Sequence, residues 1–109
     1  MKKVYICSRY KGTSVEVQKR LQLARIYSRI AWDKGFFPIA PHLYLPQFLD
    51  DGNKTERGAA LKLGIKALKE CAEVWVFGES YSNGMKKEIE RAQELKKPIK
   101  YFDQRGEPL

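Results

Sequence analysis

Apolar and polar residues alternate in blocks along the chain, and each block predicts one element of secondary structure. Residues 2–7, KKVYIC, form a short run rich in β-formers that ends at the polar segment SRYKGTS, which predicts a buried first strand. From Val15 to about Lys34 the apolar residues recur at helical spacing, and Gly35 follows them. We therefore expect a long helix that ends at this glycine, followed by a second, proline-flanked strand at FFPIAP.

The second half of the chain repeats this alternation. Residues 42–56, HLYLPQFLDDGNKTE, are polar and interrupted, so we expect a loop there, with Asn53 or Thr55 capping the helix that follows. EVWVFG, residues 73–78, is short and almost entirely apolar, as is typical of a central parallel strand covered on both faces. A last helix beginning near Ser82 or Asn83 and a last strand, IKYF, complete the order.

Strands that alternate with helices predict an α/β fold, because right-handed crossovers place successive strands in one parallel sheet between two helical layers. We expect a three-layer flavodoxin- or Rossmann-like sandwich with a four- to five-stranded parallel sheet. The chain has 109 residues, of which 43% are hydrophobic and 12% aromatic, and no segment resembles a linker. This composition is typical of one folded domain spanning residues 1–109.

Ligands of such sheets bind beyond the carboxyl ends of the strands, where the strand order reverses. Three predicted strands end there in the loops CSRYKGTS, APHLY and GESYSNGM. The first and third combine small residues with the start of a helix, which suits a phosphate cradle of backbone N–H groups, although neither is a Walker or GxGxxG motif and a plain polar turn fits the first equally well. The candidate ligand contacts in these two loops are Ser8, Arg9, Tyr10, Lys11, Gly12, Ser82, Asn83, Gly84 and Met85.

One acidic residue does not follow the amphipathic pattern of the last helix. Met85, Ile89 and Ala92 define its apolar stripe, and Glu88 falls on the same side instead of facing water. A carboxylate on the buried side points either to catalysis or to a partly buried ion pair with a lysine or arginine. Tyr5 is a core residue unless its hydroxyl reaches the pocket, and His42, the only histidine, is either a ligand contact or a structural hydrogen-bonding residue.

Charge and cysteine content narrow the functional classes. Twenty-one basic and 13 acidic side chains leave a net charge of +8, which favours anionic partners, but the charges are scattered, which argues against a nucleic-acid-binding module. Cys7 and Cys71 lack the spacing of a metal or redox motif and are expected to be small buried hydrophobic residues. We predict no metal and no cofactor. Without a signal peptide or a membrane span, the expected location is the cytoplasm.

The segments VYICSRYKG, PIAPHLY, EVWVFG, SNGMKKEIERA and KPIKYF, taken in this order and spacing, resemble the nucleoside 2-deoxyribosyltransferase-like superfamily. The resemblance covers nearly the whole chain. It is closest to small phage and bacterial members that relate to deoxyribosyltransferases and to deoxynucleoside 5′-monophosphate N-glycosidases, which are transferases and hydrolases. It implies a small-molecule partner, either a nucleotide or a nucleoside.

The resemblance also implies roles for individual residues. Gly84, Glu88, Ile89 and Ala92 match the pattern G-x-x-x-E-[LI]-x-x-A, whose glutamate attacks the anomeric carbon of the sugar. Tyr5 matches a strand tyrosine that orients this nucleophile. Lys11, Gly12 and Ser82 match residues that hold the 5′-phosphate in the monophosphate hydrolases, and His42 matches a histidine near the base. On this pattern a nucleotide fits better than a free nucleoside.

Gly64 departs from the family pattern, because relatives carry there a second carboxylate that assists the leaving base. Asp50, Asp51, Glu56 or Glu79 could replace it from nearby loops. The alternative to an enzyme is a non-catalytic protein that sequesters or senses a nucleotide. Relatives are commonly homodimers, and a second apolar stripe on the first helix, formed by Leu23, Ile26 and Ile30, agrees with a partner surface.

Overall fold

Four parallel strands form one sheet in the order β2–β1–β3–β4 in the computed structural model, which describes residues 1–109. The strands are β1 (Lys3–Cys7), β2 (Phe37–Ile39), β3 (Glu73–Phe77) and β4 (Ile99–Phe102). β1 pairs with β2 on one side and with β3 on the other, so the strand order reverses between β1 and β3. The predicted α/β fold with a parallel sheet is confirmed.

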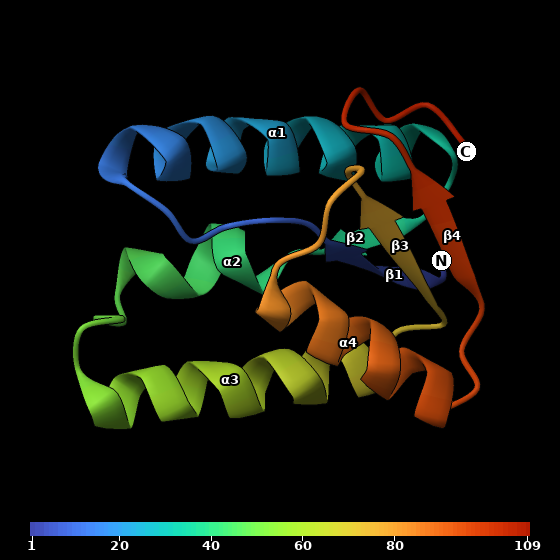
Figure 1. Ribbon diagram of the computed structural model, residues 1–109. Helices are drawn as coiled ribbons and strands as arrows, with labels where there is room; N and C mark the ends of the chain where they lie inside the picture. Colours follow the sequence, from blue (N-terminus) through green and yellow to red (C-terminus); the bar gives the residue numbers. More distant parts are fainter.

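Helices cover both faces of this sheet (Figure 1). α1 (Ser14–Asp33) lies on one face, and α3 (Lys54–Lys69) and α4 (Asn83–Glu94) lie on the other. Gly35, with φ of +89°, follows the end of α1, as predicted. Asn53, not Thr55, caps α3, because its side-chain oxygen accepts bonds from two backbone N–H groups. No helix has the length and apolar character needed to cross a membrane.

The predicted loop over residues 42–56 is wrong in its first part. The chain forms a short helix, α2 (Pro41–Tyr44), and then a single 3₁₀ turn, η1 (Leu45–Gln47). Pro41 and Pro46 occupy the first turns of these elements, where the fixed φ of proline favours helix and no N–H partner is lost. Prolines that read as interruptions in the sequence therefore begin two short helical segments.

Two hydrophobic clusters fill the two sides of the sheet. Because side chains alternate along a strand, Tyr5 and Cys7 of β1 face α3 and α4, whereas Val4 and Ile6 face α1. The buried aromatic residues between the sheet and α1 are Tyr27, Trp75, Phe77 and Phe102. The α1 side of the sheet is therefore packed with aromatic rings, whereas the side facing α3 and α4 contains the Tyr5 hydroxyl and the Cys7 thiol.

The second apolar stripe predicted on α1 does not remain free for a partner. Leu23 and Ile30 pack against the aromatic cluster, and of the three stripe residues only Ile26 is half exposed. The stripe therefore belongs largely to the core of this chain, because α1 turns a wide face toward the sheet.

Candidate functional site

The centre of the site is a contact between β1 and α4. Tyr5 and Cys7 are two residues apart on β1 and point to the same side, where α4 presents Glu88. The Tyr5 hydroxyl donates a hydrogen bond to Oε2 of Glu88, and the Cys7 thiol lies 3.5 Å from Oε1. Each carboxylate oxygen thus has its own donor from the same strand.

The electrostatic setting keeps both donors protonated. Burial, and then the charge of Glu88, raise the pKa of the Tyr5 hydroxyl and of the Cys7 thiol well above their ordinary values. Burial also raises the pKa of Glu88, and the bonds from Tyr5 and Cys7 oppose this rise. No lysine or arginine pairs with Glu88, which excludes the alternative of a partly buried ion pair.

Gly64 of α3 faces this cluster. A Cβ atom placed on Gly64 would lie 3.7 Å from the Tyr5 hydroxyl oxygen, an ordinary contact distance. A longer side chain at position 64 would therefore reach the group that contacts Glu88. This is the place where the family resemblance implies a second carboxylate, and the glycine leaves it without a side chain.

Asp50, Asp51, Glu56 and Glu79 are the candidates to replace the carboxylate missing at position 64, and they differ in whether other contacts already engage them. Asp50 accepts a bond from the backbone of Gly52, and Glu56 accepts one from the backbone of Asp50, so both stabilise the turn before α3. Glu79 lines a hollow on the α1 side of the sheet. Asp51 is exposed and close enough to Tyr10 to raise its pKa, after the larger effect of burial.

His42 joins α2 to the loop after β1. Its Nε2 atom lies 3.2 Å from the Ser8 hydroxyl, and its ring lies 6.1 Å from the ring of Tyr10, centroid to centroid. Burial lowers the pKa of His42 to about 4, so the imidazole is neutral at pH 7. A neutral ring can donate to or accept from Ser8, depending on its tautomer.

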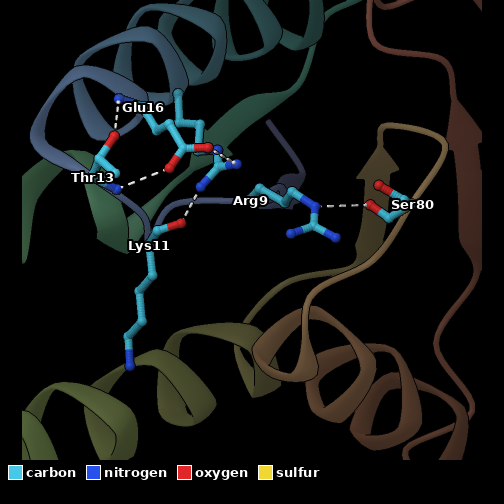
Figure 2. Close-up of polar contacts among 6 residues, drawn as sticks. Arg9, Lys11, Thr13, Glu16 and Ser80 are labelled. Atoms are coloured by element: carbon cyan, nitrogen blue, oxygen red, sulfur yellow. Dashed lines mark hydrogen bonds and ion pairs between the residues drawn. The ribbon is translucent and has the colours of Figure 1, made fainter.

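Backbone acceptors hold the loop after β1 in place (Figure 2). Arg9 Nε donates to the carbonyl of Ser80, 3.2 Å away, and so connects this loop with the loop after β3. Arg20 of α1 donates to the carbonyl of Lys11. The Lys11 side chain is exposed and points away from α1, so its ammonium group is available to an anion.

The structure gives local reasons for three other predicted residues. A Cβ atom on Gly12 would lie 2.5 Å from Arg20 Nη1 and 2.8 Å from Glu16 Oε1, so a larger residue there would displace the flexible ends of these two side chains. The Ser82 hydroxyl accepts a bond from the Met85 backbone N–H and caps α4. The Met85 side chain is buried in the core, which leaves this residue no free group for a ligand.

Asn83 and Gly84 form the exposed first turn of α4. A hollow of about 370 Å³ opens beyond the carboxyl ends of β1 and β3, on the side of α1. Ser8, Arg9 and Ser80 line it, and so does Arg20, which the sequence did not single out. Glu88 does not line this hollow, because it belongs to α4 and lies on the opposite side of the sheet from α1. The loops after β1 and β3 therefore border both the hollow and the Glu88 cluster.

Cys7 is the site residue that sequence reasoning missed. The prediction that it is buried is confirmed, but its thiol also contacts the carboxylate. The signal was present in the alternation of β1, because a residue two positions after Tyr5 shares its face.

The parallel sheet with helices on both faces is an α/β fold that is also found in a deoxyribosyltransferase. The structure is similar to that of a 2-deoxyribosyltransferase from the psychrotolerant bacterium Bacillus psychrosaccharolyticus, with a TM-score of 0.71 and 22% sequence identity. The match covers 98% of this chain and 76% of the other, and at this identity it shows a shared fold. The chain itself belongs to the family described as "Domain of unknown function (DUF7768)", which matches residues 2–102. Comparison with curated proteins returns no match.

Proposed function

We propose that this protein is an N-glycosidic bond enzyme that acts on a nucleoside 5′-monophosphate or a related nucleotide, with Glu88 as the nucleophile. The observation that carries the proposal is the Glu88 carboxylate, which is largely buried, has no cationic partner and is oriented by Tyr5. A carboxylate held in this way suits attack on an oxocarbenium-like sugar carbon. The fold shared with a 2-deoxyribosyltransferase supports the same chemistry.

In the proposed reaction, an oxygen of Glu88 forms a bond to C1′ of the sugar while the C1′–N bond breaks. The base leaves with the electron pair of that bond and takes up a proton from water or from a nearby acid. Water then forms a bond to C1′ while the bond between C1′ and the Glu88 oxygen breaks, its electron pair returns to the carboxylate, and the added water loses a proton to solvent. The products are a free base and a sugar phosphate, and a transferase would use a second base in place of water.

Several side chains support a nucleotide over a nucleoside. Lys11 has an exposed ammonium group that points away from α1, Arg9 lies two residues before it in the same loop, and Ser82 can still donate its hydroxyl proton. These groups suit a 5′-phosphate. The ring of Tyr10, in the same loop, lies 6.1 Å from the ring of His42 on α2, and the two rings suit contact with the base. The net charge of +8 also favours an anionic substrate.

The direct test is incubation of the protein with a panel of ribo- and deoxyribonucleoside monophosphates, followed by chromatography of the released base. We expect base release that Glu88→Gln abolishes, because the amide lacks the charge that attacks C1′. The matched control is Glu90→Gln, an exposed glutamate of the same helix, which should keep the wild-type rate. Base release that is unchanged in Glu88→Gln would overturn the assignment.

Gly64 favours a second candidate, a protein that binds a nucleotide without cleaving it. The position beside Tyr5 lacks the carboxylate that would assist the leaving base. The same nucleotide panel, read by thermal shift, distinguishes the two candidates. A ligand at a hundred times its dissociation constant adds about 2.7 kcal/mol of stability. Such a shift without base release would support the binding protein.

We further propose that residues 1–109 act as a single domain and associate as a homodimer. Exposed apolar side chains around α2 and α3 support this: Tyr44 and Phe48 pack edge to face at 5.0 Å on the surface, and Leu61 is also exposed. Sedimentation equilibrium should give twice the chain mass, and a strictly monomeric protein at all concentrations would contradict the proposal.

A further inference from the structure

We propose that Cys7 is a positioning residue that holds one oxygen of Glu88, and that this oxygen, Oε1, is the one that attacks the sugar. The inference rests on the proposed function, because it assigns the attacking atom of that reaction. It does not make Cys7 itself a nucleophile. The residue acts only through Glu88.

The geometry separates the two carboxylate oxygens. Tyr5 and Cys7 extend from the same face of β1, and they reach different oxygens of one side chain: Oε2 accepts from the phenol and Oε1 lies 3.5 Å from the thiol. Contacts at both oxygens restrict rotation of the carboxylate. Glu88 is therefore held in one orientation before a substrate arrives.

The two donors differ in strength. A phenol O–H is a strong donor to a carboxylate, whereas a thiol S–H is a weak one. The hydrogen bond at Oε2 consequently withdraws more electron density than the one at Oε1. The lone pairs of Oε1 are therefore donated more easily to an electrophilic carbon. The weaker donor thus marks Oε1 as the more reactive oxygen.

The same arrangement suits the intermediate. When Oε1 bonds to C1′, Oε2 becomes the carbonyl oxygen of the ester and can keep the bond from Tyr5. The thiol then loses a charged acceptor, but the backbone carbonyl of Met85 lies 4.0 Å from its sulfur and offers a second one. No buried donor is left without a partner at that step.

The charges around Cys7 keep its proton in place. Tyr5, Tyr81 and Glu88 are the titratable groups close enough to the thiol to interact with its charge, and α3 contributes the uncharged Gly64 beside Tyr5. Burial and the negative charge of Glu88 both raise the thiol pKa, so the thiolate that would attack or oxidise is disfavoured. A donor role is the one left to this sulfur.

The first test measures Glu88 itself and requires no turnover. ¹³C NMR titration of labelled glutamate carboxyl groups, with Glu88→Gln to assign the signal, gives the Glu88 pKa in each variant. We expect Cys7→Ala to raise this pKa, because a donor to the charged form is lost, and Cys7→Ser to reverse the rise. The matched control is Cys71→Ala, since that buried thiol donates to the carbonyl of Ala67 and should leave Glu88 unchanged. An unchanged Glu88 pKa in Cys7→Ala overturns the positioning role.

A spectroscopic measurement covers the case in which a Cys7 variant fails to fold. In Cys71→Ala protein, the remaining infrared S–H stretching band reports Cys7 alone, because the chain has two cysteines. We expect this band to move to higher frequency when Glu88→Ala removes the acceptor. A band that does not move overturns the proposed hydrogen bond.

The second test assigns the attacking oxygen from kinetics of base release. We expect kcat to fall about tenfold in Cys7→Ala with KM unchanged, as for the loss of one orienting hydrogen bond. Cys7→Ser should also lower kcat, although it restores the pKa, because a stronger donor competes for the lone pairs of Oε1. A wild-type kcat in Cys7→Ser overturns Oε1 as the attacking atom. Absence of base release from the wild-type protein refutes the proposed function and, with it, the role of Oε1 as the attacking atom. The carboxyl titration does not depend on turnover, so it still tests whether the Cys7 thiol contacts Glu88.

Discussion

Glu88 is the residue at which stability and chemistry oppose each other. Its carboxylate lies among buried residues, with hydrogen bonds from one strand but no opposite charge. Burying a charge without a counter-charge lowers stability, and such sites persist where function requires them. The same carboxylate that suits attack on a sugar should therefore weaken the fold.

Glu88→Gln should raise the free energy of unfolding at pH 7 by about 1 kcal/mol, as measured by urea denaturation. The folded state raises the pKa of Glu88, so the stability contributed by its protonated form is present below the ordinary carboxyl pKa and is lost as pH rises through the raised value. The gain from the substitution should accordingly disappear near pH 4. An equal gain at both pH values would show that the charge is not its cause.

His42 should give the opposite dependence on pH. Burial lowers its pKa from 6.5 to about 4, so the unfolded chain binds a proton more tightly than the folded one, and stability falls as pH drops between these values. The loss should amount to at most about 3 kcal/mol. Urea denaturation of wild-type and His42→Gln protein from pH 7 to pH 4 isolates this contribution, which should be missing in the variant. Parallel curves for the two proteins would contradict it.

In the proposed reaction, α3 is the helix that would supply an acid to the leaving base beside the Glu88 cluster. Gly64 lies in the middle of α3, where glycine is an unfavourable helix residue, yet it faces the Tyr5 hydroxyl at a distance that leaves room for a Cβ atom. The Glu88 cluster therefore lacks a side chain from α3 because residue 64 is glycine, and not because a side chain would not fit there.

Gly64→Asp should place a carboxyl group beside Tyr5 and increase the rate of base release about 100-fold, at the low end of the effect of general acid catalysis. The control is Gly64→Asn, which has nearly the same size but cannot act as the acid. Comparison of kcat for the two variants checks the prediction. Equal rates would mean that protonation of the base does not limit the reaction.

The two sides of the sheet differ in the kind of residue that they hold. The aromatic residues on the α1 side pack closely, with Tyr27 and Phe77 stacked at 4.1 Å, while the side facing α3 and α4 holds Glu88, Tyr5 and Cys7. Because β1 alternates between these layers, neighbouring residues in the sequence act on different properties of the protein.

Ile6 tests this division, because it lies between Tyr5 and Cys7 in the sequence but packs on the α1 side. Ile6→Val should lower the free energy of unfolding by about 1 kcal/mol through the loss of one buried methylene. The Glu88 pKa, followed by carboxyl NMR, should not change. A shift as large as that in Cys7→Ala would show that the two layers are coupled through the strand.

The sequence by itself determined the elements and the sides on which their residues lie. Helical spacing placed Glu88 on the inner side of its helix, strand alternation placed Tyr5 inside, Gly35 marked the end of one helix, and Asn53 or Thr55 marked the start of another, because each of these depends on neighbours within a few residues. The same local rules did not anticipate α2, where prolines began a helix instead of interrupting one.

Only the tertiary structure decided which of these residues meet. Glu88 lies 83 positions from Tyr5 and 81 from Cys7, and the pairing of β1 with β3 is what brings α4 over β1. The second role of Cys7, the open position at Gly64 and the separation of Glu88 from the hollow on the α1 side likewise arise from contacts between distant elements. Residue spacing along the chain does not contain these distances, because packing of the helices on the sheet sets them.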